Sequence, residues 1–156
     1  GGGVHLIDLM AWLTGNRPDS VYAVGSRICT RHTDFHYPDF VSATLTFPSG
    51  LVGRITSNYG CVHQHHHIMR IFGTNATFIY DDAGPRLHTT RDPAVAAGAV
   101  DLPPLQAGKG DLIPDFVSAV RYDEDLDTQG MFDVISICAA CDASLQSNSE
   151  TGVQYV

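Results

Sequence analysis

The first residues able to do chemistry lie at the start of the chain, where three glycines precede Val4 and His5. Glycine lets the backbone approach a ligand or another segment closely, so His5 is predicted to lie where a crowded turn leads into a helix. Free N–H groups and the positive end of the helix dipole disfavour imidazolium there and favour the neutral ring that accepts a proton. The spacing alone favours a histidine packed at a helix start, and a proton-accepting catalytic role for His5 is the alternative.

A second group of imidazoles occurs in the run His63-Gln64-His65-His66-His67. If residues 61–68 are extended, His63, His65 and His67 point to one face. Neighbours on one strand face lie roughly 6 to 7 Å apart, too far for three imidazoles to converge on a zinc ion, so we expect no metal site. The row is interpreted as lining a substrate cleft, with His63 and His65 as substrate-binding residues, or alternatively as an exposed edge or subunit contact.

Residues 31–38 are polar and aromatic and cannot continue a strand pattern. Such loops over a cleft suit sugar binding, so His36 and Tyr37 are candidate substrate-binding residues. The alternative is an ordinary surface loop. Tyr59 is a further substrate-binding candidate, and Arg70 a weaker one.

The four cysteines show no paired framework. Cys138 and Cys141 form a C-x-x-C, but it lies in a helical stretch with no strand and turn before it. We interpret them as two small buried residues one helical turn apart rather than a redox pair. Reduced thiols indicate a cytoplasmic protein.

Positioning these residues requires a helix first and then a sheet. Apolar residues recur at helical spacing from Leu6 to Leu13, and Gly15 is predicted to end that helix. Alternating patterns and turn residues then predict strands over 20–30, 39–47, 51–59, 66–72, 77–81 and 86–90, a loop over 91–110, and a last strand over 153–156. Asp111 is predicted to cap a helix over 111–121, and a second helix covers 129–147.

The two later helices are each expected to bury an apolar side. Leu112, Phe116 and Val120 form that side in the first. Met131, Ile135, Cys138 and Leu145 form it in the second. The fold class is therefore α+β: a predominantly antiparallel open sheet with helices packed on one face, in a single domain over residues 1–156.

Adjacent apolar residues, as in Phe40-Val41 and Ile71-Phe72, indicate that both faces of the sheet over residues 39–81 are at least partly covered. Helices would cover one face, and self-association would cover the other.

Composition narrows the possible partners. Nine basic against seventeen acidic residues give a formal charge of −8, which argues against binding to nucleic acid or to an anionic membrane surface. The chain is 44% apolar and has no apolar run of eighteen residues. A chain that opens on three glycines without methionine is interpreted as a fragment.

Several segments together resemble a known family. Gly3-Val4-His5-Leu6-Ile7-Asp8-Leu9 with Trp12-Leu13-Thr14-Gly15 resembles the helix that opens the second half of the glucose-fructose oxidoreductase / inositol dehydrogenase / MocA-like (Gfo/Idh/MocA) oxidoreductases. Residues 39–60 resemble that family's central hairpin, residues 70–74 its strand and turn "I-x-G-T-x-G", and residues 116–156 its closing helices.

This resemblance implies a C-terminal substrate-binding and dimerisation domain of an NAD- or NADP-dependent dehydrogenase acting on a sugar, polyol or nucleotide sugar. The histidine matching His5 is usually the acid/base there, and the aspartate often found four residues earlier is Gly1 here. No G-x-G-x-x-G and no Glu-Lys-Pro segment occurs, so cofactor binding and the usual lysine would lie upstream, and the fragment alone would be inactive. A non-catalytic sugar-sensing or dimerisation module on the same fold is the alternative.

Overall fold

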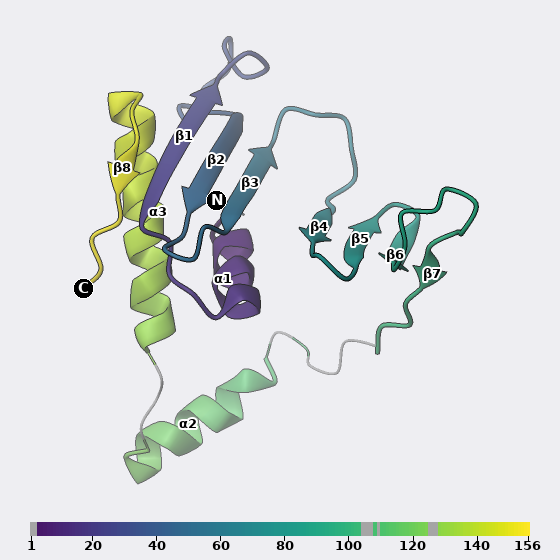
Figure 1. Ribbon diagram of the computed structural model, residues 1–156. Helices are drawn as coiled ribbons and strands as arrows, with labels where there is room; N and C mark the ends of the chain where they lie inside the picture. The colour runs from purple at the N-terminus through teal and green to yellow at the C-terminus, as the bar shows by residue number, and fades with distance from the viewer. Residues whose placement is uncertain (1–2, 104–107, 109, 125–127) are drawn as a thin grey trace. The chain divides into compact units, whose positions relative to one another are not determined.

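The computed structural model describes residues 3–103, 108, 110–124 and 128–156. These residues form two compact units (Figure 1). Unit 1 contains Gly1–Cys61 and Asp125–Val156, and unit 2 contains Val62–Glu124. Each unit holds one four-stranded sheet.

The sheet of unit 1, sheet A, is antiparallel, with strand order β3-β2-β1-β8. Its strands are β1 (Ser20–Ser26), β2 (Phe40–Thr46), β3 (Val52–Asn58) and the short β8 (Thr151–Gly152). The turn between β2 and β3 depends on Gly50, whose φ of 83° places it in the left-handed region. Alternate residues of the three long strands point to one face, which carries Val21, Ala23, Ala43, Leu45 and Ile55, all buried.

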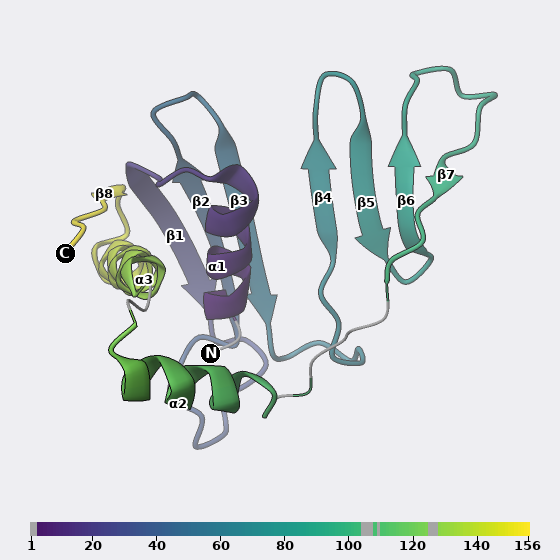
Figure 2. The same ribbon diagram turned by 90° about the horizontal axis from the view of Figure 1, so that it is seen from below.

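Two helices of unit 1 pack on that face: α1 (Gly3–Thr14) and α3 (Gln129–Ser147). Figure 2 shows α1 beside β3 and α3 beside β1. Met10 of α1 lies directly over Gly53, where an added Cβ would meet the methionine sulfur at 2.3 Å. The missing side chain at Gly53 is therefore what lets α1 approach β3.

Helix α3 also protects the exposed edge of β1. Strand β8 pairs only with Ser20 and Val21, so the next edge amide, that of Ala23, needs another acceptor. The fully buried Ser144 supplies it: Ala23 N–H donates to Ser144 Oγ at 2.9 Å, and that hydroxyl donates to the Ser149 carbonyl at 2.6 Å. One serine thus ties the helix, the edge strand and the turn before β8 together.

Unit 2 contains a second antiparallel sheet, sheet B, with strand order β4-β5-β6-β7. It consists of β4 (Met69–Phe72), β5 (Thr77–Asp81), β6 (Gly84–His88) and β7 (Gly98–Ala99), and helix α2 (Leu112–Tyr122) follows. The tight β5–β6 turn uses Gly84 at φ 86°. Across this turn the Arg86 guanidinium donates to both oxygens of Asp81, at 2.6 and 2.7 Å.

The α+β class, the antiparallel pairing and the helices on one face of a sheet are confirmed. The prediction of one sheet over residues 39–81 is wrong, because β2 and β3 belong to sheet A while β4 and β5 belong to sheet B. A single domain over residues 1–156, made up of both units, stays a prediction.

Element limits agree to within about one residue for β2, β3, β5, α2 and α3, the first helix ends before Gly15 as predicted, and the other strands differ. The strand predicted over 20–30 ends at Ser26, and the one predicted over 66–72 begins at Met69. The last strand is Thr151–Gly152 rather than 153–156. The loop predicted over 91–110 contains β7, and its residues 104–107 and 109 lie outside the described residues.

The apolar sides predicted for the later helices are partly wrong. Phe116 and Val120 of α2 are exposed, and so are Met131 and Ile135 of α3. The buried side of α3 instead carries Val134, Ile137, Ala140 and Ser144, which meet sheet A. Asp111 stands at the N-cap of α2 but makes no side-chain capping hydrogen bond.

The Asp81–Arg86 pair gives unit 2 a pH-dependent element. Hydrogen bonds from Arg86, and then from the Ala83 amide, lower the pKa of Asp81 from 3.8 to about 2. A carboxyl with a depressed pKa in the folded state stabilises the fold above its unfolded pKa and loses that contribution as pH falls through the folded value. We expect the stability difference between the parent and Asp81→Asn to shrink between about pH 4 and pH 2.

Denaturant unfolding at a series of pH values measures this difference. Asp101→Asn, which changes an exposed carboxylate of the same unit, is the control and should show no such window. If the difference in unfolding free energy between the parent and Asp81→Asn stayed constant from about pH 5 to about pH 2, the prediction would be contradicted.

Candidate functional site

His5 lies in the first turn of α1, and its side chain is exposed. The helix begins at Gly3, where an added Cβ would lie 3.1 Å from the hydroxyl of Ser57 on β3. This glycine therefore places the start of the helix close to the carboxyl end of β3. His5 is open to solvent here, at the end of a helix with free N–H groups. Its role, as acid/base or as a histidine packed at a helix start, stays a prediction. Gly1, which stands where the aspartate was expected, lies outside the described residues.

The loop with His36 and Tyr37 lies at the same end of sheet A. Its base is fixed by the buried Asp39, whose Oδ2 accepts from the Thr30 amide at 2.7 Å and the Thr30 hydroxyl at 3.0 Å. His36 and Tyr37 are both exposed, and the Tyr37 ring packs edge-on against Phe35 at 6.0 Å between centroids. The buried carboxylate thus holds the base of a loop whose tip presents ring groups to solvent.

Tyr59 joins this group through the backbone. Its amide donates to the Asp39 carbonyl at 2.7 Å, directly after β3 ends. The register places Ser26, Phe40 and Asn58 side by side at this end of the sheet. The fold therefore brings four predicted site residues to one end of sheet A: His5, His36, Tyr37 and Tyr59. His63 and His65 belong to unit 2.

The extended histidine row is not observed, because residues 61–68 contain no strand. The rings pair in two groups instead: His63 with His66 at 6.2 Å between centroids, and His65 with His67 at 5.1 Å. Among the described residues, no group of three or more histidine, cysteine or acidic side chains is arranged to hold a metal ion.

His63 interacts with two acceptors. Its Nδ1 lies 2.7 Å from the Gln64 carbonyl, and its Nε2 lies 3.4 Å from Asp82 Oδ2. The Gln64 carbonyl, and then Asp82, raise the pKa of His63 above its usual 6.5. With both ring nitrogens so engaged, His63 has less capacity to bind a substrate hydroxyl than the exposed His65.

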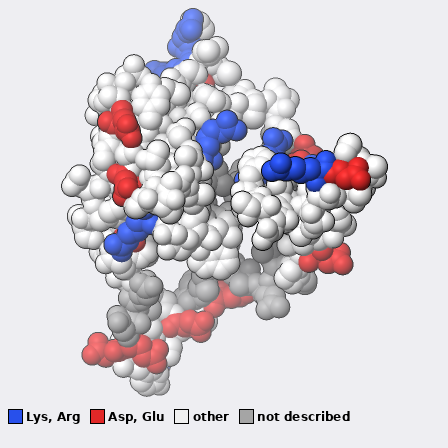
Figure 3. Space-filling view, viewed as in Figure 1, with Lys and Arg blue, Asp and Glu red and all other residues white. Residues whose placement is uncertain are grey.

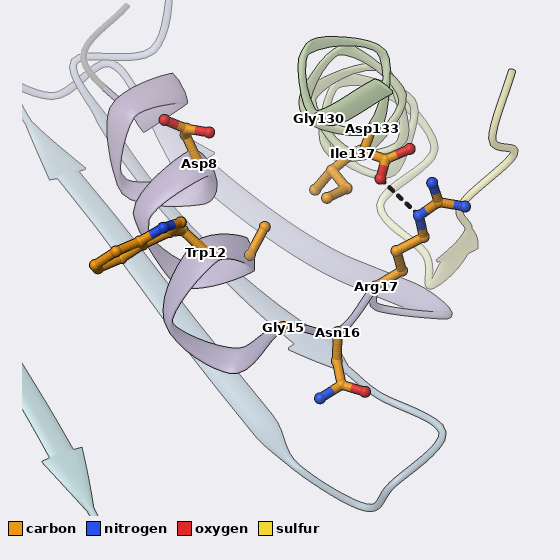
Figure 4. A pocket seen from close by; sticks show the side chains of 9 residues that line it. Asp8, Trp12, Gly15, Asn16, Arg17, Gly130, Asp133 and Ile137 are labelled. Atoms are coloured by element: carbon orange, nitrogen blue, oxygen red, sulfur yellow. Dashed lines mark hydrogen bonds and ion pairs between the residues drawn. The ribbon is translucent and has the colours of Figure 1, made fainter. Parts of the chain in front are cut away.

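A pocket of about 260 Å³ lies between α1 and α3, and sequence patterns gave no sign of it. Figure 4 shows Asp8 and Trp12 on α1, and Arg17 reaching Asp133 of α3. The Arg17 Nε donates to Asp133 Oδ2 at 2.6 Å, and the guanidinium carbon lies 5.2 Å from the centre of the Tyr155 ring. Arg17 and Asp133 are 116 positions apart, so no local pattern could pair them. The complete lining is Asp8, Ala11, Trp12, Gly15, Asn16, Arg17, Gly130, Asp133 and Ile137.

This pocket is built as a structural junction. Tyr155 donates its hydroxyl to the Pro18 carbonyl at 2.7 Å, and burial, then the charge of Asp133, raises the pKa of Tyr155 to about 12. Asp133 also accepts from Gln129 at 3.0 Å. The Arg17–Asp133 bond therefore joins α3 to the turn after α1, and the bond from Tyr155 to Pro18 joins the C-terminal segment to the same turn.

The C-x-x-C of α3 has the predicted packing role. Cys138 and Cys141 are partly buried beside the core of unit 1. Burial raises the pKa of both thiols, that of Cys141 to about 11. Such thiols are not poised as thiolates at neutral pH, which agrees with packing rather than redox chemistry.

On the face drawn in Figure 3, the acidic and basic side chains of the described residues lie in small scattered groups. The described helices include none with both the length and the apolar character needed to cross a membrane. Exclusion of nucleic acid stays a prediction.

Comparison with solved structures agrees with this fold. Levoglucosan dehydrogenase in complex with NADH and levoglucosan superimposes with a TM-score of 0.71 at 19% identity, over 99% of this chain and 50% of that one. An NAD-binding protein from Listeria innocua gives 0.70 at 18% identity, over 96% and 49%. An oxidoreductase domain protein from Kribbella flavida gives 0.70 at 16% identity, over 97% and 50%.

The chain thus spans about half the length of these solved proteins. No curated protein matches its sequence significantly. The family model of the GFO/IDH/MocA C-terminal domain matches residues 2–79, which is half of the chain and covers α1, sheet A apart from β8, and the start of sheet B. The chain therefore belongs to the GFO/IDH/MocA C-terminal domain family.

Proposed function

We propose that this chain is the substrate-binding half of an NAD- or NADP-dependent cytoplasmic dehydrogenase that oxidises a sugar, a polyol or a nucleotide sugar. The observation that carries the proposal is the position of His5, exposed in the first turn of α1 at the end of sheet A that also carries the His36–Tyr37 loop and Tyr59. Family membership and a similar fold in a dehydrogenase solved with NADH and levoglucosan support it.

In this proposal His5 accepts the proton of the substrate hydroxyl that is oxidised, because a solvent-open imidazole can reach a bound substrate without moving the fold. Tyr37 and Tyr59 provide phenolic hydroxyls that donate to or accept from other hydroxyl groups, and His36 provides a further ring. His65 is assigned a substrate contact from unit 2, and His63 a secondary one.

The described residues do not fit a nicotinamide dinucleotide. Such a cofactor is held by a glycine-rich turn between a strand and a helix of a parallel β-α-β unit, whereas every strand pair described here is antiparallel. We therefore assign NAD or NADP binding to sequence outside this chain.

The cofactor assignment predicts that the 156-residue chain alone does not bind NADH. Titration of NADH fluorescence with the purified chain tests this, with the full-length protein as the positive control. Saturable binding to the chain alone at micromolar concentration would show that the cofactor site has been misplaced.

The function itself is tested by assaying the full-length protein with NAD and NADP against sugars, polyols and UDP-sugars. The panel includes levoglucosan and L-sorbose, which two of the solved neighbours contain. Turnover of any member supports the proposal. Sugar binding without turnover would instead support a non-catalytic sugar-sensing module on the same fold.

We also propose self-association through the uncovered face of sheet A. That face carries Tyr22, Val24 and Val52, all exposed, with threonine and serine neighbours on β2. Exposed apolar side chains set among hydroxyl groups and Arg54 make a mixed face, and mixed faces of this kind also occur in interfaces between subunits. We expect a dimer or larger assembly by light scattering, and Tyr22→Arg should convert it to monomer, whereas Val95→Arg, an exposed change in unit 2, should not. A parent that stays monomeric at high concentration contradicts this proposal.

A further inference from the structure

One carboxylate, Asp82, holds the segment that leads from unit 1 to sheet B. This linker, residues 62–68, begins at the boundary between the units and ends where β4 starts. Two of its rings face Asp82 in the β5–β6 turn: His63 Nε2 lies 3.4 Å from Oδ2, and His66 Nε2 lies 3.7 Å from Oδ1. The second distance is too long for a hydrogen bond, so Asp82 is bonded to one ring and only near the other.

The two acceptors that face the ring of His63 favour its protonated form. Its Nδ1 faces the Gln64 carbonyl at 2.7 Å, and its Nε2 faces the carboxylate. A neutral imidazole carries one N–H, so it can donate to only one of these acceptors, whereas imidazolium donates to both. When His63 loses a proton to solvent while keeping the bond to Gln64, its Nε2 lone pair points at Asp82, and that contact becomes repulsive.

His66 is placed to donate a hydrogen bond to the Asp82 carboxylate. Its side chain is 17% exposed, and within the described part of the chain its Nε2 is buried and lacks a hydrogen-bond partner. The ring packs against Tyr80 of β5 at 5.4 Å between centroids. A buried nitrogen without a partner costs free energy, which neutral His66 would recover by donating Nε2–H to Asp82.

The nearby charges do not compete for Asp82. Arg86 is bonded to Asp81, and Arg70 acts on the same Asp81 carboxyl.

We propose that His63, His66 and Asp82 form a proton-operated clasp: Asp82 accepts from His63 imidazolium at lower pH and from the His66 Nε2–H once His63 is deprotonated. The exchange releases residues 62–65 while residues 66–68 stay fixed to sheet B. The mobility of residues 62–65 therefore depends on pH, whether or not the full-length protein is a dehydrogenase.

The sign of the effect follows from the direction of the His63 shift. Its pKa is raised on folding, so its contribution to stability is complete below the usual 6.5 and is lost as pH rises through the folded value. The clasp is thus held by His63 in mildly acidic solution and passes to His66 as pH rises through the folded-state pKa of His63.

NMR of the ¹⁵N-labelled 156-residue chain tests the clasp by titrating the histidine rings and measuring backbone ¹H–¹⁵N NOE values at about pH 5.5 and pH 8.5. In the parent, NOE values for residues 62–65 should fall at the higher pH while those for 66–68 remain high. Asp82→Asn should lower the pKa of His63, leaving only the part of the shift that the Gln64 carbonyl causes, and should leave residues 62–65 mobile at both pH values.

His66→Phe keeps a ring against Tyr80 but removes the receiving nitrogen, so the higher-pH mobility should extend to residues 66–68. Asp101→Asn should behave like the parent. An unchanged His63 pKa in Asp82→Asn, or parent NOE values that are the same at both pH values, would overturn the proposal. Failure of the dehydrogenase assay would leave these measurements unaffected.

Discussion

Replacement of His5 by alanine in the full-length protein is expected to lower turnover by about 10² to 10⁴ fold, the usual contribution of a positioned acid or base. The loss should appear in kcat, because the proton transfer occurs only on the way to the transition state. Melting temperature should change little, since the ring is exposed and packs in no core. Steady-state kinetics with the best substrate of the panel, together with thermal unfolding, measure both effects.

Two further substitutions test whether the loss of turnover is specific to His5. His67→Ala removes an exposed imidazole elsewhere and should leave kcat within a few fold of the parent. His65→Ala should mainly raise KM, because a substrate contact made equally in the ground and transition states is uniform binding. Activity of His5→Ala close to that of the parent would remove His5 from the mechanism. A large loss of kcat at His65 with none at His5 would move the reacting centre to unit 2.

Leu45→Ala is expected to destabilise unit 1 by about 2 to 5 kcal/mol. Leu45 lies in β2, between β1 and β3 of sheet A, is 1% exposed and packs opposite Val21 beneath the helices. Truncation leaves a cavity in a region that strands on both sides prevent from collapsing. Denaturant unfolding followed by circular dichroism measures the change.

The matched control for this substitution is Leu51→Ala in the turn before β3, where the side chain is 41% exposed. Surface changes of this kind usually alter stability by less than about 0.5 kcal/mol. Equal effects of the two substitutions would show that Leu45 is no more deeply packed in solution than Leu51, and would contradict the prediction.

Much of the local structure of unit 1 followed from sequence alone. The alternation of apolar and polar residues over 39–47 and the Pro-Ser-Gly turn predicted the β2–β3 hairpin, because side chains alternate between faces of a strand and Gly50 supplies the positive φ that the turn requires. Gly15, at φ 59°, ends α1 for the same reason. His5 in the first turn of a helix was predictable from the glycines and the helical spacing after it.

Long-range pairing was not predictable in this way. Sequence patterns indicate a strand but not its partner, so they could not separate β2–β3 from β4–β5 into two sheets. The same limit applies to the apolar stripe of α2, which a helical pattern assigns to a core although Phe116 and Val120 are exposed. Spacing describes which residues share a side of a helix, and only the tertiary structure decides whether anything packs against that side.

The sequence by itself therefore determined which residues could do chemistry and the α+β class: the acid/base candidate at the start of α1, the polar aromatic loop, and antiparallel strands with helices on one side. The tertiary structure decided which of these residues meet. Asp39 and the register of sheet A bring the His36–Tyr37 loop and Tyr59 to the end of the sheet where α1 begins. Asp82, nineteen residues away from His63, contacts that ring in a segment that forms no regular strand, and no local pattern could pair the two.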